Sequence, residues 1–356
     1  MIIFLPFITA FIVTTIATPI SLIFIKKLGL FDDPKKHKHP AIIHKKPIPR
    51  AGGIPLFIGV MVALILFLPI TKITIAIFFA SLISLIVGVL DDKFDISPYL
   101  RFPINIIAAA IVVGSGIGIP FITNPLGGIL YLNSIILSFD FLGHHSIVLF
   151  SDIIAMIWIV WVMNMLNWSK GVDGQMPGIV AISAFVIGIL SLRFPLTQEN
   201  TLIAASLSFA IAGSSLGFLL FNFYPAKIFP GYGATSIYLL LAVVSILSGA
   251  KLATAILVMG IPMIDGIFTI IRRILTGHSP FRHDKKHLHH LLLKMGFGQR
   301  SIAIFYWLIS AIVGTISLTL STKGKLFAII MLVVLVGGAL LFLHLAIINR
   351  DEKKII

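Results

Sequence analysis

The sequence predicts an all-α polytopic membrane protein with about 10–11 transmembrane helices, and three observations lead to this fold class. Hydrophobic residues make up 58% of the 356 residues and charged residues only 11%, with a mean hydropathy of +1.08. A soluble domain carries about 25% charged residues. Apolar runs long enough to cross a bilayer recur along the chain, and Lys and Arg collect in alternate connecting segments. We treat residues 1–356 as a single integral-membrane domain.

Eleven apolar stretches qualify as spans, because a helix needs about 17–25 residues to cross the hydrocarbon core. The first stretch lacks a basic leading segment and a small-residue cleavage site, so it is interpreted as a span rather than a signal peptide. An odd number of spans places the two termini on opposite faces. The predicted spans are residues 2–25, 53–70, 73–90, 102–120, 152–167, 179–194, 201–223, 236–250, 252–271, 301–320 and 326–348.

The distribution of positive charge predicts the orientation. If residues 91–101 face the cytoplasm, 22 of the 27 Lys and Arg residues lie inside and five lie outside. Cytoplasmic loops carry the excess of Lys and Arg. The prediction is therefore a multi-pass protein of the cell (inner) membrane, with the N-terminus outside and the C-terminus in the cytoplasm.

Composition also narrows the possible chemistry. The chain has no cysteine, so disulfides, thiolate catalysis and cysteine metal sites are excluded. The net charge of +14 belongs to the inner loops, which favours a membrane surface over a nucleic-acid partner. No internal repeat of 20–50 residues is visible, which disfavours an inverted-repeat transporter. The long outer segment 121–151 carries turn residues that suggest a hairpin or a re-entrant piece.

The first inner cluster of interest is acidic. Asp91, Asp92 and Asp95 stand at a predicted span end, and at helical spacing Asp95 shares a face with one of the other two. They could form a solvated acidic cap. Alternatively, they could serve phosphate chemistry or hold Mg²⁺, for which carboxylate oxygens are suitable ligands.

The loop before the second span ends in Pro47-Ile48-Pro49-Arg50-Ala51-Gly52-Gly53. A basic loop on an anionic leaflet would explain its lysines. The paired glycines, however, allow the backbone to approach a ligand closely at a helix start. Arg50 is then a candidate for holding a phosphate group.

The segment after the fifth predicted span is polar. Asn164 and Asn167 lie three residues apart at its end, followed by Lys170 and by Asp173-Gly174. Amides at this place can cap a helix, but two amides followed by Gly, Asp and Gly are more typical of a turn that faces a ligand. A weaker candidate is the glycine turn 229–236, which could cap the next helix or bind phosphate.

The last inner loop is the richest in polar residues. Asp265 lies late in a span, which by default suggests a function, although Arg272 and Arg273 could simply pair with it. Further on, Arg282 stands among basic residues that precede three histidines, His287, His289 and His290. Helical zinc sites usually use histidines four residues apart, so hydrogen bonding to phosphate is the favoured role.

Taken in order, these motifs are Pro-x-Pro-Arg-x-Gly-Gly, Asp-Asp-x-x-Asp, Asn-x-x-Asn with a following Asp-Gly, the glycine turn and His-x-His-His. The pattern resembles the polyprenyl-phosphate N-acetylhexosamine-1-phosphate transferases (glycosyltransferase family 4), bacterial enzymes that start cell-envelope glycan synthesis. The likeness covers about residues 33–296. Asp265 and the histidine segment look most similar to the branch that uses N-acetylglucosamine or a related UDP-sugar, the undecaprenyl-phosphate N-acetylglucosamine-1-phosphate transferases.

The resemblance implies transfer of sugar-1-phosphate from a UDP-sugar to a polyprenyl phosphate, with release of UMP and with Mg²⁺ as cofactor. It assigns Asp91, Asp92 and Asp95 to the metal or to the lipid phosphate. Asn167 and Asp173 are tied to metal or nucleotide, and His287, His289 and His290 to the diphosphate. The catalytic set is thus the three aspartates and three histidines, and the metal ligands are Asp91, Asp92 and Asp173. The substrate-binding candidates are Arg50, Asn164, Asn167, Lys170, Asp173 and Arg282. A homodimer is compatible with this prediction.

Two departures from the family pattern bear on the metal. Lys170 stands where the family usually has the first Asp of its second loop, and Tyr232 stands where it has the Asp of its fourth loop, which is a metal ligand in the muramyl branch. Two charge units from the lysine and one from the tyrosine make the site more positive by three. Neighbouring charges interact by about 1–4 kcal/mol in partly wet sites, so Mg²⁺ affinity should fall.

Three functions therefore remain open. We favour the sugar-1-phosphate transferase, with the hypothesis that the Lys170 ammonium replaces part of the metal's charge. The first rival is a paralogue that binds lipid phosphate or nucleotide-sugar without turnover. The second is a transporter or channel, which predicts carboxylates near the bilayer midplane rather than at the cytoplasmic edge.

Overall fold

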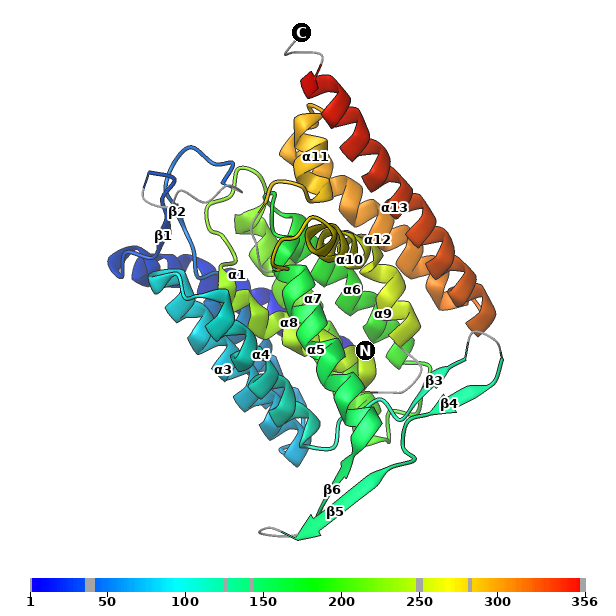
Figure 1. The fold of residues 1–356 in the computed structure, drawn as a ribbon. Coiled ribbons are helices and arrows are strands. Elements are labelled where there is room, and N and C mark those ends of the chain that lie inside the picture. Colours follow the sequence, from blue (N-terminus) through cyan, green and yellow to red (C-terminus); the bar gives the residue numbers. More distant parts are fainter. Residues whose placement is uncertain are drawn as a thin grey trace.

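The computed structural model describes residues 2–35, 42–124, 127–140, 144–247, 252–280 and 284–352. It is a bundle of α-helices with three small two-stranded sheets at its ends (Figure 1). The helices are α1 (Leu5–Lys27), α2 (Gly53–Phe67), α3 (Lys72–Phe94), α4 (Pro98–Val113), α5 (Leu149–Trp168), α6 (Gln175–Ser191), α7 (Glu199–Asn222), α8 (Thr235–Ile246), α9 (Leu252–Val258), α10 (Gly260–Leu275), α11 (Leu288–Lys294), α12 (Gln299–Thr319) and α13 (Thr322–Glu352). Short 3₁₀ turns, η1 (Ile2–Phe4) and η2 (Tyr232–Ala234), precede α1 and α8.

The helices confirm the all-α membrane fold. Within the described ranges, six are long and apolar enough to cross a membrane, namely α1, α3, α5, α7, α12 and most of α13, and a bent pair makes up to seven. Four shorter apolar helices of the described chain fall on the remaining predicted spans. At 1.5 Å per residue, a helix of 15–17 residues such as α2, α4 or α6 is shorter than the roughly 30 Å hydrocarbon core. The predicted count of 10–11 is therefore reached only when these short helices are included.

One predicted span is not a straight helix. The sequence suggests a continuous span over 252–271, but α9 and α10 meet at Met259 with a bend of 81°. Gly260 and Pro262 follow the break. Glycine weakens a helix, and proline cannot donate the backbone hydrogen bond that would join the two halves. The span predicted over 252–271 is therefore a broken span, and α10 leaves the direction of α9.

Helix α7 lies at the centre of the bundle and is buried along most of its length, whereas α13 is buried along little of it. Small residues let α1 pack tightly on α7, since a Cβ at Gly213 or Gly217 would overlap the α1 backbone. A buried chain of hydroxyls joins three helices here, because Thr14 donates to Ser214 and Ser214 donates to the Leu56 carbonyl. These contacts fix the relative positions of α1, α2 and α7.

The strands form antiparallel pairs. β1 (Phe31–Asp32) pairs with β2 (Ile48–Pro49) just before α2, with Phe31 opposite Pro49. The outer segment predicted as a hairpin contains two hairpins, β3 (Phe121–Thr123) with β4 (Ile129–Tyr131), and β5 (Ile136–Asp140) with β6 (His144–Val148). Figure 1 shows these hairpins at the opposite end of the bundle from β1, β2 and α11. The predicted outer and inner segments thus lie at opposite ends of the molecule.

Candidate functional site

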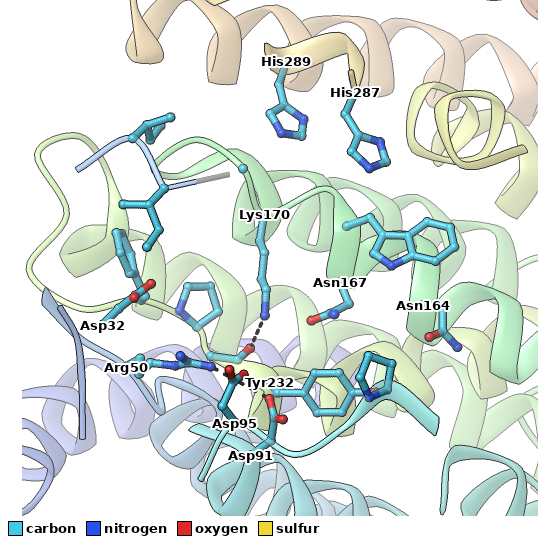
Figure 2. Close-up of a pocket in the computed structure, with 18 of the residues that line it drawn as sticks. Asp32, Arg50, Asp91, Asp95, Asn164, Asn167, Lys170, Tyr232, His287 and His289 are labelled. Atoms are coloured by element: carbon cyan, nitrogen blue, oxygen red, sulfur yellow. Dashed lines mark hydrogen bonds and ion pairs between the residues drawn. The ribbon is translucent and has the colours of Figure 1, made fainter. Parts of the chain in front are cut away.

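Segments that are far apart in sequence meet around one polar cavity of about 300 Å³. Figure 2 shows His287 and His289 on one side and Arg50, Asp91, Asp95 and Tyr232 on the other, with Lys170 pointing toward the second group. Of the twelve predicted site residues, ten line the cavity: Arg50, Asp91, Asp95, Asn164, Asn167, Lys170, Asp173, His287, His289 and His290. Asp92 is buried next to the cavity and contacts Arg50 and the backbone of the turn. Arg282 lies outside the described residues.

The two adjacent aspartates at the end of α3 are held by two arginines. Arg101, from α4, donates to both oxygens of Asp91 at 3.0 and 2.9 Å. Arg50 donates through Nε to Asp92 Oδ1 at 3.0 Å, and its Nη2 lies 3.9 Å from Asp91 Oδ2. Both carboxylates are almost completely buried. The acidic cluster is therefore not a solvated cap, because fixed guanidinium groups compensate two of its charges.

Asp95 has a different place from the one that helical spacing suggests. It ends α3 with a φ of +50° in the left-handed region, and its side chain is exposed. The chain turns at this residue, which directs α4 back along α3. Asp95 reaches the cavity from this turn and not from the buried face that carries Asp91.

The glycine turn before η2 fits tightly beneath the aspartates. Gly231 has a φ of +67°, and a Cβ at this position would overlap the Asp92 carboxylate. The Tyr232 backbone N–H donates to Asp92 Oδ1 at 2.9 Å. A Cβ at Gly53 or Gly88 would overlap the backbone of Gly233, so α2 and α3 both pack directly on this turn. The turn is thus held by backbone packing as well as by Asp92.

The two residues that depart from the family pattern touch the same turn. Lys170 is half-buried, and its Nζ donates to the Gly231 carbonyl at 3.0 Å. The Tyr232 ring is buried, and its hydroxyl accepts a hydrogen bond of 3.1 Å from Asn105 Nδ2. Burial is the main influence on the ammonium and lowers the pKa of Lys170 to about 8, partly opposed by Asp92 and Asp91. We call Arg50, Arg101 and Lys170, together with Asp91, Asp92 and Tyr232, the cation floor.

The end of α5 brings amides and an aromatic ring to the cavity. Asn164 donates back to the Val160 carbonyl of its own helix at 2.7 Å. Asn167 has a buried Oδ1 without a hydrogen-bond partner among the described residues. Trp168 lies beside His287, with ring centroids 6.3 Å apart, and the Arg273 guanidinium lies 5.9 Å from its ring. An unpartnered amide oxygen at a cavity wall is a site for a donor group of a ligand.

Asp173 lines the cavity but is partly used by the protein itself. Its Oδ2 accepts from the Ala226 backbone N–H at 2.9 Å. Its own backbone N–H donates to the Gln299 side chain at 3.2 Å. Burial raises the pKa of this carboxyl, with the Ala226 hydrogen bond acting against it. Asp173 thus anchors the loop before Pro230 as well as facing the cavity.

The opposite side of the cavity is built around Asp265, from α10. Its Oδ2 lies 2.9 Å from His287 Nδ1, and its Oδ1 accepts from the Leu288 backbone N–H at 3.0 Å. Because a carboxylate only accepts, Nδ1 of His287 carries a proton and Nε2 remains for the cavity. Asp265 therefore orients His287 and also starts helix α11.

The other two histidines are buried, and His289 stacks on His287. The rings of His287 and His289 are nearly parallel, with centroids 5.7 Å apart, and His290 packs on His289 at 4.3 Å. A Cβ at Gly171 would overlap the His289 ring, so this close approach requires glycine. Burial lowers the pKa of His289 well below its usual value and that of His290 to about 4, with neighbouring histidines adding to both effects. We call these three histidines and Asp265 the histidine wall.

Arg272 and Arg273 do not pair with Asp265, which corrects the simple alternative from the sequence. Both donate to Asp284 Oδ2, at 2.9 and 3.0 Å. Burial alone would raise the pKa of Asp284, but the hydrogen bonds from Arg272 and the Lys286 backbone, with the charges of both arginines, hold it well below its usual value. This ion pair joins the end of α10 to the segment that leads into the histidines.

Comparisons with known proteins agree with this geometry. Residues 74–249 match the family model described as glycosyl transferase family 4. The chain is 30% identical over 347 residues, 92% of its length and 88% of the relative's, to a probable undecaprenyl-phosphate N-acetylglucosaminyl 1-phosphate transferase of Bacillus subtilis. It is 31% identical over 330 residues, 89% of its length and 85% of the relative's, to an undecaprenyl-phosphate alpha-N-acetylglucosaminyl 1-phosphate transferase of Haemophilus influenzae.

The chain belongs to glycosyl transferase family 4. A decaprenyl-phosphate N-acetylglucosaminephosphotransferase of Mycobacterium leprae is a further relative, 28% identical over 330 residues, 84% of this chain and 79% of that protein. The resemblance inferred from the motifs is confirmed. As a member of family 4 with several helices long enough to cross a membrane, the chain is a multi-pass membrane protein.

The metal that the family 4 resemblance implies does not fit the residues of this site. Mg²⁺ is usually bound by one or two carboxylates together with water and phosphate. Here both oxygens of Asp91 accept from Nη1 of Arg101, and Oδ1 of Asp92 accepts from Arg50 and from a backbone N–H. Of these two carboxylates, the buried Oδ2 of Asp92 alone has no hydrogen-bond partner among the described residues. Among the described residues, no three His, Asp or Glu side chains converge as a metal site. The Mg²⁺ cofactor thus stays a prediction, and no step is assigned to it.

Sequence reasoning about this family 4 chain missed several site residues. Arg101 is the partner of Asp91, and Asn105 holds Tyr232. Trp168 contacts the histidine wall. Arg101 could have been predicted as a partner of the aspartates, because it is a basic residue that closely follows the acidic cluster in the sequence. No comparable sequence signal marks Asn105 or Trp168.

Proposed function

We propose that this chain transfers N-acetylhexosamine 1-phosphate from a UDP-sugar to a polyprenyl (undecaprenyl-type) phosphate, giving polyprenyl-diphosphate-sugar and UMP. The observation that carries the proposal is a continuous polar-to-apolar site. The polar cavity shares Phe102, Asn164 and Trp168 with a neighbouring apolar groove of about 500 Å³. A substrate with a phosphate head and an isoprenoid tail has this same division.

The groove suits a lipid tail because its lining is almost entirely apolar. It lies between α4, α5 and α10, with Ile106 from α4, Ile157 and Trp161 from α5, and Ile270 from α10. Ile106 and Ile157 are exposed on the outer surface of the bundle, where a membrane would surround them. Burying an isoprenoid chain against such side chains is favourable by about 25 cal/mol per Å² of apolar area.

The polar cavity suits a sugar nucleotide diphosphate. The cation floor supplies three positive side chains beside two compensated carboxylates, and the histidine wall supplies imidazole nitrogens. The unpartnered Oδ1 of Asn167 can accept from a nucleobase or sugar N–H or O–H group. A diphosphate placed between floor and wall would receive charge from one side and hydrogen bonds from the other.

The transfer is a substitution at phosphorus. An oxygen of the lipid phosphate attacks the β-phosphorus, which carries the sugar, and a new P–O bond forms. The bond from this phosphorus to the bridging oxygen breaks, and that oxygen leaves with UMP. Two anions must approach each other, so neutralising charge is the principal task of the protein. Asp95 is the exposed carboxylate in the cavity and is the candidate for orienting the lipid phosphate.

The proposed location is the cell (inner) membrane, with the cavity on the cytoplasmic face, the N-terminus outside and the C-terminus inside. The cavity end of the bundle carries the Lys- and Arg-rich segments, while the far end carries hairpins that have few charges. This distribution follows the positive-inside rule. The expected role is to catalyse the first step in the synthesis of a cell-envelope glycan. A homodimer stays a prediction.

Release of UMP tests the function. The purified full-length chain is mixed in detergent with undecaprenyl phosphate and, in turn, UDP-N-acetylglucosamine and UDP-N-acetylgalactosamine, in buffer that contains Mg²⁺. UMP and a lipid-linked sugar should appear together for at least one donor. His289→Ala removes an imidazole of the histidine wall and should lower the rate of UMP release, which would tie the activity to this cavity. Absence of UMP with every UDP-N-acetylhexosamine would refute the transferase proposal and favour a paralogue that only binds.

A further inference from the structure

The three cations of the floor are not equivalent, and the difference points to a ligand. Arg50 and Arg101 each have a carboxylate partner, at 3.0 and 2.9 Å. Lys170 donates only to a neutral carbonyl, that of Gly231. Among the described residues no carboxylate lies within ion-pair distance of its Nζ. A half-buried ammonium without an acidic partner, at the wall of a cavity, is a place for an anionic ligand.

Tyr232 organises these cations. The Arg101 guanidinium lies 4.6 Å and the Lys170 Nζ lies 5.8 Å from the centroid of its ring. Cations are attracted to an aromatic ring within about 6 Å. The hydrogen bond from Asn105 fixes the ring from its hydroxyl end. The Tyr232 ring thus provides one ordered surface for two positive groups. A carboxylate at this position has no aromatic face for them to pack against.

The same turn links the lysine to the aspartates. The Gly231 carbonyl accepts from Lys170, while the next backbone N–H, of Tyr232, donates to Asp92. Gly231 itself must be glycine because Asp92 occupies the space of a Cβ. Lys170, Tyr232 and Asp92 are therefore positioned by one short backbone segment, and the two departures in sequence form one unit in space.

We propose that this cation floor replaces the divalent metal ion of the reaction: Lys170 and Arg101, ordered by Tyr232, with Arg50, bind the diphosphate directly, and the protein works without a bound metal. This inference rests on the proposed transferase function. It follows from charge, because a dication placed among three cationic side chains would be repelled, while both oxygens of Asp91 and Oδ1 of Asp92 already accept hydrogen bonds from arginines and leave the buried Oδ2 of Asp92 as the one unpaired oxygen of the two carboxylates among the described residues. In this arrangement the carboxylates orient the arginines instead of binding a metal.

The first test measures metal binding without any reaction. Mn²⁺ is titrated into the purified full-length protein and followed by electron paramagnetic resonance. The wild type should show no saturable binding. The double variant Lys170→Asp, Tyr232→Asp should gain a saturable site, because both replacements return a carboxylate to the floor. The matched control is Lys323→Asp, Tyr131→Asp, with the same residue changes at exposed positions, one at the start of α13 and the other in β4 of the outer hairpin. It should behave like the wild type.

Saturable Mn²⁺ binding by the wild type would overturn the inference, whatever the double variant does. A double variant that keeps the wild-type melting temperature but gains no site would overturn the part assigned to Lys170 and Tyr232. If the double variant does not fold, the wild-type titration still decides the question.

The second test measures UMP release after exhaustive dialysis against EDTA. Wild-type turnover should persist within about twofold of its value in Mg²⁺ buffer, and Lys170→Met should lower it by about 10- to 100-fold, as expected for loss of a charge-assisted hydrogen bond. Lys170→Arg should retain most of the rate. Loss of wild-type activity in EDTA with recovery in Mg²⁺ would overturn the inference but leave the transferase function intact. Absence of UMP in both buffers would refute the transferase function, and the Mn²⁺ titration would still test the metal.

Discussion

The two sides of the cavity are built in different ways. The histidine wall comes from a short stretch of chain between Asp265 and His290, and its order matches the family motif. The cation floor is assembled from four distant segments, around Arg50, Asp91, Lys170 and Tyr232. Both departures from the family motif lie in the floor. At physiological pH the wall presents buried, neutral His289 and His290, whereas the floor presents fixed positive charge.

The two sides should therefore tolerate substitutions differently. A locally built wall can be interpreted from its own motif. In the floor, by contrast, a single replacement has meaning only together with residues elsewhere in the chain. Lys170 and Tyr232 are 62 residues apart in the sequence, yet both touch the turn at Gly231. The floor should therefore be more sensitive in stability, and the wall more sensitive in catalysis alone.

The largest expected effect is on the stability of the floor. Arg101→Ala leaves Asp91 buried without the guanidinium that donates to both of its oxygens, and removing one member of a buried pair costs about 3–5 kcal/mol of unfolding free energy. Denaturant unfolding in mixed micelles measures the loss. The double variant Arg101→Ala, Asp91→Ala should recover part of it. His289→Ala, in the wall, should lose less, and equal losses for both sides would contradict the contrast drawn here.

A wall variant should affect turnover more than folding. Asp265→Asn places an amide against His287 Nδ1 and disturbs the orientation of its ring. We expect kcat/KM for UMP release to fall about 10- to 100-fold, as for loss of an outer partner of a functional histidine, with a small change in melting temperature. Asp152→Asn, at the far end of α5, is the control. A large loss of stability with unchanged turnover would show that Asp265 serves only to hold α11.

The pH dependence should separate the two sides by charge. Burial sets the pKa of Lys170 at about 8, with Asp92 and Asp91 raising it and Arg50 and Arg101 lowering it. The ammonium is thus mostly present at pH 7 and mostly lost at pH 9, so floor-dependent turnover should fall about tenfold between these values. Lys170→Arg stays charged and should show a flatter profile. Identical profiles for wild type and Lys170→Arg would remove Lys170 as the titrating group.

The smallest expected effect concerns the lipid groove, which adjoins both sides. Trp161→Ala removes a side chain that lines the groove and does not line the polar cavity, although its ring packs on Trp168, which lines both. The KM for polyprenyl phosphate should rise several-fold, in line with about 1.5–3 kcal/mol at most for a large apolar side chain, while the KM for the UDP-sugar stays constant. Phe79→Ala, exposed on α3 away from the groove, is the control. An equal rise in KM for both substrates would argue against separate binding sites for the lipid tail and the nucleotide.

Much of the fold and of the site could be predicted from the sequence. Apolar runs locate the helices because lipid requires about the same length and polarity everywhere. The polar inner segments identify the cavity lining, including Asn167, Lys170 and His289. The contacts that could not be predicted depend on the direction in which the backbone continues after a helix. Asp91 meets Arg101 only because the chain reverses in the left-handed conformation of Asp95, which aspartate adopts less readily than glycine.

The bend at Met259 escaped prediction for a similar reason. Hydropathy averages over a window and reports 252–271 as one apolar run, whereas Gly260 and Pro262 act at single backbone hydrogen bonds. The groove is lined in part by Ile270 of α10, which follows this bend, so its position could not be predicted from the sequence either.

Helix α10 contributes to both proposed substrate-binding sites. Its Ile270 borders the lipid groove, and its Asp265 fixes both the imidazole of His287 and the first N–H of α11. Since the helix departs from α9 at a single joint, a small rotation there would carry the hydrophobic border and the imidazole together. Binding of the isoprenoid chain and binding of the sugar nucleotide would then be thermodynamically linked, so that each ligand raises the affinity for the other.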